Sequence, residues 1–302
     1  MKFQRRAYTM IELVLVIIVL GIVASIGAEI IVKLYDNYIK TKSINRLQAQ
    51  TELVLDQISK RLSYRIKGST IARNKSNFGD YVTLSDANNS YQVLEWIGKD
   101  NDSFRGRKNP GWSGFIDLDS NDTNRSQIKT AGSELNTTND IIKALSNNSV
   151  ILDNSIIGKN RPAIIFKGSS DYNVTRYGWD GTRGLYTYRV DYNNGANNIL
   201  HLIDSNSTYP SEIYEQYNLA WSAYAIVPEG TDNDFNLTLH YNYQPWENER
   251  YDQNASTSVL VEHASTFRFI QIGNTIRIKL CIHDDNRSGN FDFSFCKERV
   301  IF

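Results

Sequence analysis

Residues 8–28 read YTMIELVLVIIVLGIVASIGA, and this stretch decides the fold of the chain. Its larger part, residues 13–28, carries no charged side chain. An α-helix rises about 1.5 Å per residue, so a helix over this stretch spans roughly 30 Å, the thickness of a bilayer core. The sequence therefore predicts a membrane-spanning helix at residues 8–28.

The charges that precede this segment predict its orientation. Lys2, Arg5 and Arg6 lie on its N-terminal side, and basic flanks favour the cytoplasmic face of a membrane. We therefore expect a cytoplasmic N-terminus, with everything after Ala28 on the other face. A cleaved secretory signal peptide or a simple signal anchor is the alternative. Against cleavage, the apolar run is longer than a usual signal-peptide core, and no clear small-residue site followed by a turn closes it.

One carboxylate, that of Glu12, lies inside the apolar run. A charge at that depth is unfavourable, so it needs a partner or a task. The residues around it, Ala7 to Val14 (AYTMIELV), resemble the processing site of type IV pilins and type II secretion pseudopilins. In that family a prepilin peptidase cuts on the cytoplasmic side, and the new N-terminus is methylated. Ala7 stands where the family usually has Gly, and Tyr8 where it usually has Phe.

This resemblance implies a leader at residues 1–7, cleavage between Ala7 and Tyr8, and a role for Glu12 in filament assembly. It also implies a single-pass bacterial inner-membrane protein with a periplasmic head, which is extracted into a periplasmic or surface filament. The implied partners are prepilin peptidase, other pilins or pseudopilins that contact the N-terminal helix, and secreted cargo or an outer-membrane pore.

Residues 29–67 change from uniformly apolar to amphipathic, and no Pro or Gly interrupts them. Gly68 follows as a helix stop signal,. We predict one spine helix over residues 8–67, and expect its outer stripe to carry a globular head; a coiled-coil seam is the alternative. Residues 47–66 are similar to the end of the spine helix in J-type minor pseudopilins. The stripe has three- and four-residue spacing and consists of Ile44, Leu47, Thr51, Val54, Leu55, Ile58, Leu62 and Ile66,.

Residues 68–302 show the pattern of an α+β head built mainly from antiparallel strands,. A helix is expected at residues 139–145, with Thr138 or Asn139 as its cap,. Strands are expected at 163–166, in a hairpin of 184–191 with 198–203, in a pair of 219–227 with 236–243, and in a meander of 265–272, 275–282 and 293–302,.

Composition and motifs argue against several classes of function. The formal net charge is zero, which gives no electrostatic case for direct nucleic-acid binding. The four His residues show no His-Glu-x-x-His motif and no metal-ligand spacing, and Gly-x-Ser-x-Gly and phosphate-binding Gly loops are absent from the sequence,. We therefore expect a protein that is not an enzyme.

Cys281 and Cys296 lie in or beside neighbouring predicted strands. The compartment beyond the membrane is oxidising, so we expect a disulfide, with two free packed thiols as the alternative. Between them, oxygen-bearing side chains follow an EF-hand-like spacing around Gly289, although Phe295 replaces the usual bidentate acid,. A calcium site and a polar hairpin tip are the alternatives here, and a weaker candidate string lies at residues 117–122. The calcium candidates are Asp284, Asn286, Ser288, Asn290 and Asp292.

Together with the resemblance, these patterns predict a non-catalytic minor pseudopilin or minor pilin, at or near the tip of a type II secretion or type IV pilus-like filament. The rival function is an inner-membrane-anchored periplasmic module that binds a glycan or a protein. Tryptophan can stack on sugars, and the candidates for that role are Trp96, Trp112, Trp179, Trp221 and Trp246.

Overall fold

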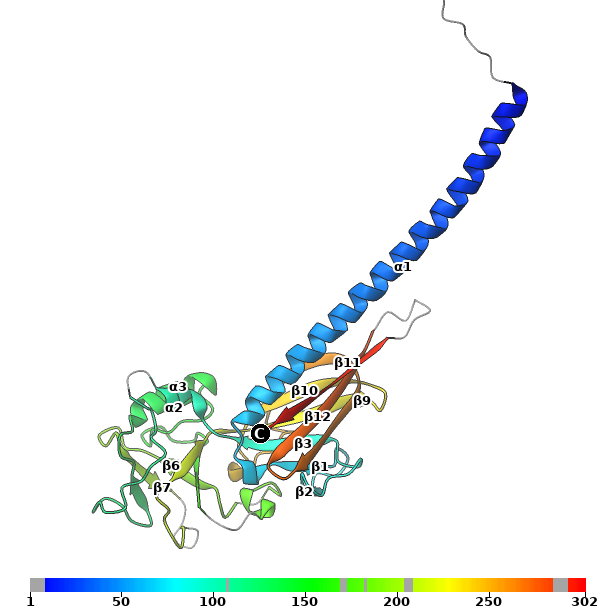
Figure 1. Cartoon of the computed structure of the whole chain (residues 1–302). Helices are drawn as coiled ribbons and strands as arrows, with labels where there is room; N and C mark the ends of the chain where they lie inside the picture. The colour runs from blue at the N-terminus through cyan, green and yellow to red at the C-terminus, as the bar shows by residue number, and fades with distance from the viewer. Residues whose placement is uncertain (1–8, 107–108, 169–172, 182–183, 204–208, 285–292) are drawn as a thin grey trace, which may run out of the picture.

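The apolar run and the amphipathic stripe form one continuous helix, α1 (Met10–Ser63), in a computed structural model of the chain. The structure describes residues 9–106, 109–168, 173–181, 184–203, 209–284 and 293–302. At 1.5 Å per residue, α1 is roughly 80 Å long. Figure 1 shows its first half standing clear of the head and its last turns lying against it.

The end of α1 differs from the sequence prediction of residue 67. The helix stops at Ser63, because the following backbone joins the edge of a strand. Arg65 forms a bridge with Gly98, and the N–H of Ile66 donates to the carbonyl of Ile97 at 2.9 Å. Gly68 lies in the next short 3-10 turn, η1 (Lys67–Ser69).

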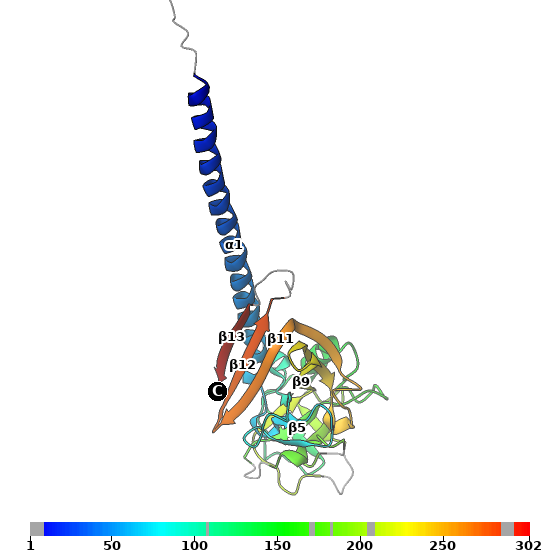
Figure 2. The same cartoon turned by 90° about the vertical axis from the view of Figure 1, so that its right-hand side faces the viewer.

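An eight-stranded antiparallel sheet forms the part of the head that contacts α1. Its order is β13-β12-β11-β10-β9-β3-β1-β2. The strands are β1 (Ile71–Arg73), β2 (Tyr81–Thr83), β3 (Val93–Gly98), β9 (Ser222–Thr231), β10 (Asp234–Tyr243), β11 (Ser256–Ile272), β12 (Thr275–His283) and β13 (Ser294–Ile301). Figure 2 shows β11, β12 and β13 beside the lower half of the helix.

A five-stranded sheet and two short helices form the rest of the head. The sheet order is β4-β7-β6-β5-β8. Short 3-10 turns, η2 (Val174–Tyr177) and η3 (Pro245–Glu247), connect other parts of the head. The strands are β4 (Gln127–Lys129), β5 (Ala163–Phe166), β6 (Tyr188–Asp191), β7 (Ile199–Leu202) and β8 (Tyr217–Ala220), and the helices are α2 (Asn101–Arg105) and α3 (Leu135–Leu145).

Most of the expected strand pairings are confirmed. β6 pairs with β7, β9 with β10, and β11, β12 and β13 form the C-terminal meander. The expected strand at 219–227 is instead divided, because β8 belongs to the small sheet and β9 to the large one. Trp221 lies between them, and its carbonyl accepts a hydrogen bond from the Gln244 side chain rather than from a strand partner.

The predicted cap of α3 is wrong. The helix begins at Leu135, after Glu134, which makes no side-chain capping bond. Asn139 lies inside the helix, where its side-chain oxygen accepts from the backbone N–H groups of Leu152 and Asp153 at 3.0 and 3.1 Å. Its polar side chain therefore holds a neighbouring loop instead of a helix end.

The stripe of α1 is buried against one face of the large sheet, so it packs on the head of its own chain, as predicted. Leu47, Thr51, Val54, Leu55, Ile58 and Leu62 are its buried members. Across the interface lie apolar side chains from the sheet, among them Leu237, Ile278 and Leu280. Separate apolar clusters lie around β1, β3 and β9 and within the small sheet. The fold is thus α+β with a pilin-like architecture.

Candidate functional site: the spine helix and its junction with the head

The first turn of α1 is closed by a reciprocal pair of hydrogen bonds between Thr9 and Glu12. The Glu12 N–H donates to the Thr9 hydroxyl at 3.4 Å, and the Thr9 N–H donates to the Glu12 carboxylate at 3.0 Å. This capping box satisfies backbone donors that a helix start leaves unpaired. Within this chain, then, Glu12 has a partner at its own helix end. Ala7 and Tyr8, the expected cleavage residues, lie outside the described residues.

The N-terminal half of α1 exposes nearly all of its apolar side chains. Ile17 is 62% exposed and Leu20 is 66% exposed. This helix is long and apolar enough to cross a membrane. The first charged residue after Glu12 is Glu29, which pairs with Lys33 at 2.7 Å one helical turn further on. The charge-free run therefore ends with the predicted membrane span, although exposed apolar side chains such as Ile31 and Leu34 continue beyond it.

The junction with the head combines the buried stripe with ion pairs to the edge strand β13. Lys297 lies 2.8 Å from Glu52, and Arg299 lies 2.5 Å from Asp56. The Lys297 ammonium lowers the pKa of Glu52. These half-exposed pairs join β13 to the helix beside the buried stripe.

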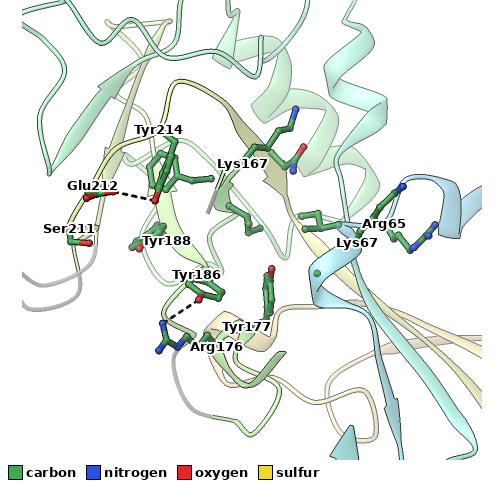
Figure 3. Close-up of a pocket in the computed structure, with 16 residues that line it drawn as sticks. Arg65, Lys67, Lys167, Arg176, Tyr177, Tyr186, Tyr188, Ser211, Glu212 and Tyr214 are labelled. Carbon is green, nitrogen blue, oxygen red and sulfur yellow. Dashed lines mark hydrogen bonds between the residues drawn. The ribbon is translucent and has the colours of Figure 1, made fainter. Parts of the chain in front are cut away.

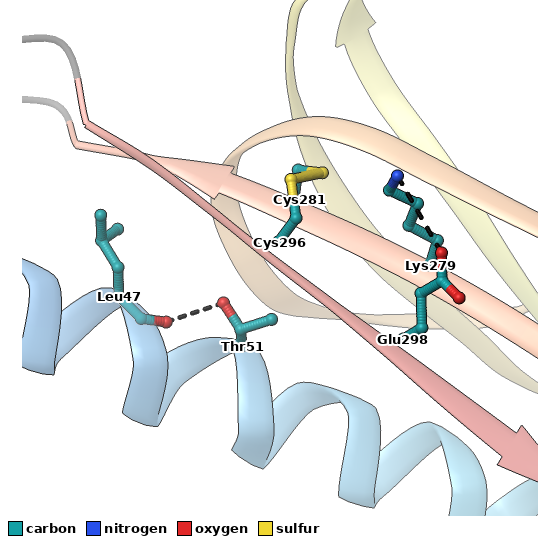
Figure 4. Close-up of a disulfide and its surroundings, with 6 residues drawn as sticks. All are labelled: Leu47, Thr51, Lys279, Cys281, Cys296 and Glu298. Carbon is teal, nitrogen blue, oxygen red and sulfur yellow. Dashed lines mark hydrogen bonds and ion pairs between the residues drawn. A yellow bond between two sulfur atoms is a disulfide. The ribbon is translucent and has the colours of Figure 1, made fainter.

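The predicted disulfide between Cys281 and Cys296 is confirmed. The two residues are directly opposite each other on β12 and β13. Figure 4 shows the bond joining these two strands, together with the helix turn that carries Leu47 and Thr51. Side chains alternate along a strand, so Cys296 points away from the helix while its neighbour Lys297 reaches it. The disulfide thus attaches the edge strand that contacts α1 to the rest of the sheet.

Of the calcium candidates, only Asp284 is among the described residues. Its carboxylate accepts a hydrogen bond from the Ser43 hydroxyl of α1. Asn286, Ser288, Asn290 and Asp292 lie outside the described residues. In the weaker string, Asp122 pairs with Lys129 at 3.4 Å. The contact of Asp284 adds a polar bond between the head and the spine.

The tryptophans are core residues and offer no open face for a sugar. Trp96 and Trp112 are fully buried, and Trp221, the most exposed of the five, is only 7% exposed. The indole N–H groups of Trp112 and Trp246 donate to the backbone carbonyls of Asp100 and Arg161 at 2.9 and 2.8 Å. Sugar stacking by tryptophan is therefore excluded as the basis of a glycan site in this fold.

A cavity of about 510 Å³ between η1, β5 and η2 carries tyrosines instead. Figure 3 shows Tyr214 bonded to Glu212 and Tyr186 bonded to Arg176 along its wall. Its lining also includes Lys67, Lys167, Tyr177 and Tyr188. These residues come from distant parts of the chain, so sequence spacing gave no signal for the cavity. The combination of aromatic faces and cations suits an anionic or sugar-like ligand.

Comparisons with protein-family models, with curated proteins and with solved structures found no match.

Proposed function

We propose that the chain is a non-catalytic subunit of a type II secretion or type IV pilus-like filament, of the minor pseudopilin or minor pilin kind. One observation carries the proposal. The same helix exposes its apolar first half and buries a stripe of its second half in the head. A head fixed on a helix whose free half is apolar suits a subunit that resides in a membrane and later packs that half against other helices.

The proposed location is the bacterial inner membrane, with the N-terminus in the cytoplasm and the head in the periplasm. Prepilin peptidase would cleave between Ala7 and Tyr8, and other pilins or pseudopilins would pack on residues 8–28. Secreted cargo or an outer-membrane pore would contact the head if the subunit sits at the filament tip.

In this proposal Glu12 changes partner on assembly. In the single chain its carboxylate accepts from the Thr9 N–H at 3.0 Å. Cleavage before Tyr8 would create an α-amine one residue upstream of Thr9. A carboxylate in hydrocarbon is stabilised by a cation, so the amine of its own chain or of a neighbouring subunit would pair with it and set the axial register between helices.

The processing test is an intact-mass measurement on protein purified from membranes. We expect the mass of a chain that begins at Tyr8, with one added methyl group. A mass that still includes MKFQRRA would contradict the proposed maturation.

The assembly test compares variants at Glu12. Glu12→Gln keeps an acceptor for the Thr9 N–H but removes the charge, and Glu12→Leu removes both. We expect both variants to insert into the membrane but to lose crosslinks to partner subunits. The control is Glu29→Gln, which removes a charge from the same helix at an exposed ion pair. Normal partner crosslinking by Glu12→Gln would show that the charge is not the docking group.

A second candidate function is a membrane-anchored periplasmic binding module, favoured by the tyrosine-lined cavity. It predicts that a ligand from the cell envelope, such as an anionic glycan, binds the full-length protein in detergent and that Tyr188→Ala weakens binding. An uncleaved N-terminus at Met1 together with such binding would favour this function over the filament subunit.

A further inference from the structure

Two histidines and a carboxylate from successive strands meet at one end of the large sheet. Asp234 is the first residue of β10, His263 lies within β11, and His283 is the last residue of β12. The carboxylate oxygen of Asp234 lies 3.0 Å from Nδ1 of His263 and 3.6 Å from Nε2 of His283. Among the residues that the structure describes, this is the one group of His, Cys, Asp or Glu side chains compact enough to hold a metal ion.

A bulge in β11 brings His263 to this cluster. β11 is one residue longer than β10 between the pairs Phe235–Ala264 and Leu237–Val261. His263 sits in that bulge with a φ of 57°, in the left-handed region. A bulge redirects a side chain relative to the regular alternation of a strand. The two histidine rings consequently approach to 5.5 Å between centroids in an edge-to-face arrangement.

We propose that Asp234, His263 and His283 form a binding site for a divalent transition metal of the zinc class. Zinc binds imidazole nitrogen and carboxylate oxygen at about 2.0–2.2 Å in tetrahedral geometry, which places neighbouring ligand atoms about 3.3 Å apart. The two measured separations lie on either side of that value, and all three ligand atoms lie within 4.8 Å of one another.

The choice of zinc over calcium follows from the ligand types. Imidazole suits zinc and its neighbours in the transition series, whereas calcium and magnesium take oxygen ligands. Three protein ligands leave a fourth position for water. This site is separate from the acid- and amide-rich candidate string that begins at Asp284, and it does not depend on the proposed filament function.

The position of the cluster predicts what the metal does. His263 and His283 line a groove of about 410 Å³ whose other wall is α1, with Leu47, Gln50 and Val54. The residue after His283, Asp284, accepts a hydrogen bond from Ser43 of the same helix. A metal ion that joins β10, β11 and β12 at this point would fix the positions of these strand ends where they contact α1. Its role is therefore structural, at the junction of head and helix.

The test uses full-length protein in detergent, freed of metal with a chelator and then titrated with Zn²⁺ by calorimetry. We expect one Zn²⁺ per chain and a higher melting temperature with Zn²⁺ than with chelator. Co²⁺ in place of Zn²⁺ should give the visible absorption of a tetrahedral site. Loss of a group that merely orients a metal ligand weakens binding about 10–100-fold. Loss of a direct ligand should therefore weaken Zn²⁺ binding by at least about 100-fold.

Two variants and one control separate the site from general histidine binding. His263→Gly removes a ligand and accepts the positive φ, and His283→Gln removes another ligand without touching the bulge. His201→Gln is the control, because His201 pairs with Asp191 at 3.4 Å outside the cluster. We expect the first two variants to lose binding and the control to keep it.

The alternative is that the Asp234 carboxylate accepts hydrogen bonds from the two histidines and the cluster binds no metal ion. Failure of the unmodified protein to bind Zn²⁺ would establish that alternative and overturn the metal site. Binding that survives both His263→Gly and His283→Gln would also overturn it. If His263→Gly does not fold, retention of binding by His283→Gln alone is sufficient to reject the proposal.

Discussion

The buried ion pair between Arg73 and Glu95 offers the sharpest test of how the head is held together. Arg73 on β1 and Glu95 on β3 lie 2.7 Å apart, and their side chains are 0% and 1% exposed. Glu95 also accepts from the Tyr243 hydroxyl at 2.8 Å, and Arg73 donates to the carbonyl of Trp179 at 2.9 Å. Through these contacts the pair connects β1 and β3 to β10 and to the loop that carries Trp179, within one apolar cluster.

The proposed change is Glu95→Gln, which keeps the side-chain shape and leaves the Arg73 guanidinium buried without a counter-charge. Breaking a buried pair from one side typically costs about 3–5 kcal/mol. That is a large part of the roughly 5–15 kcal/mol that stabilises an ordinary domain. The matched control is Glu298→Gln, which removes a half-exposed partner of Lys279 at 4.0 Å. Exposed pairs contribute about 0–1 kcal/mol.

The assay is urea unfolding of full-length protein in detergent, followed by tryptophan fluorescence. We expect a fall of about 3 kcal/mol or more for Glu95→Gln and of less than about 1 kcal/mol for Glu298→Gln. The double variant Arg73→Gln with Glu95→Gln should be less destabilised than the sum of its single changes, because it leaves no unpaired charge. Equal losses for Glu95→Gln and Glu298→Gln would refute the reasoning.

Three further outcomes follow from the junction and the small sheet. Leu55 is fully buried on α1, so Leu55→Ala should lower the free energy of unfolding by about 2–5 kcal/mol,. Leu53 is 58% exposed, so Leu53→Ala should change the free energy of unfolding by less than about 0.5 kcal/mol,. Reduction of the disulfide, which closes a loop of 15 residues, should lower the free energy of unfolding by about 3 kcal/mol without altering the circular dichroism spectrum. Burial raises the pKa of Asp100 to about 6. A carboxyl whose pKa is higher in the folded than in the unfolded chain stabilises the fold while it is protonated. The free energy of unfolding should therefore fall by about 3 kcal/mol as the pH rises from 4 to above 6. Asp100→Asn should remove that fall when urea unfolding is measured across this pH range.

The main features of the fold were predictable because each depends on a local pattern. The exposed first half of α1 follows from a long apolar run, and the outer half from a stripe at helical spacing,. The C-terminal meander follows from alternating side chains between turn residues. The short strands β1, β2 and β4 were missed, because a strand of three residues is too short to display a period. The six-residue strand β3 was also missed, because it is buried along its whole length and so lacks the alternation of a half-exposed strand,.

The limits of the sequence prediction arise where tertiary contacts override a local signal. Gly68 is a good helix stop signal, yet α1 ends earlier because the backbone of Arg65 and Ile66 pairs with the end of β3. Asn139 is a good helix cap, yet it serves a loop from inside α3.

The candidate sites divide in the same way. The disulfide was predictable because Cys281 and Cys296 belong to adjacent strands of one hairpin. The histidines of the Asp234 cluster show no ligand spacing in the sequence, since a bulge and two strand pairings bring them together. No local sequence pattern shows that these three side chains lie close together, and none shows the tyrosine-lined cavity.

The C-terminus of the chain lies where the spine joins the head, and this arrangement bears on the proposed function. The Arg65 guanidinium, just past the end of α1, donates to the carbonyls of Phe302 and Asn274 at 3.3 and 3.2 Å. The edge strand β13 is held on one side by ion pairs to α1 and on the other by the disulfide to β12. The helix covers one face of the sheet with its outer half, so contacts between subunits would form through the free half of the spine, where the apolar side chains are exposed. A subunit drawn along a filament by its helix would then carry its head as one attached body. Buried apolar contacts and charge pairs hold the helix on the head, and the disulfide holds the contacted strand in the sheet.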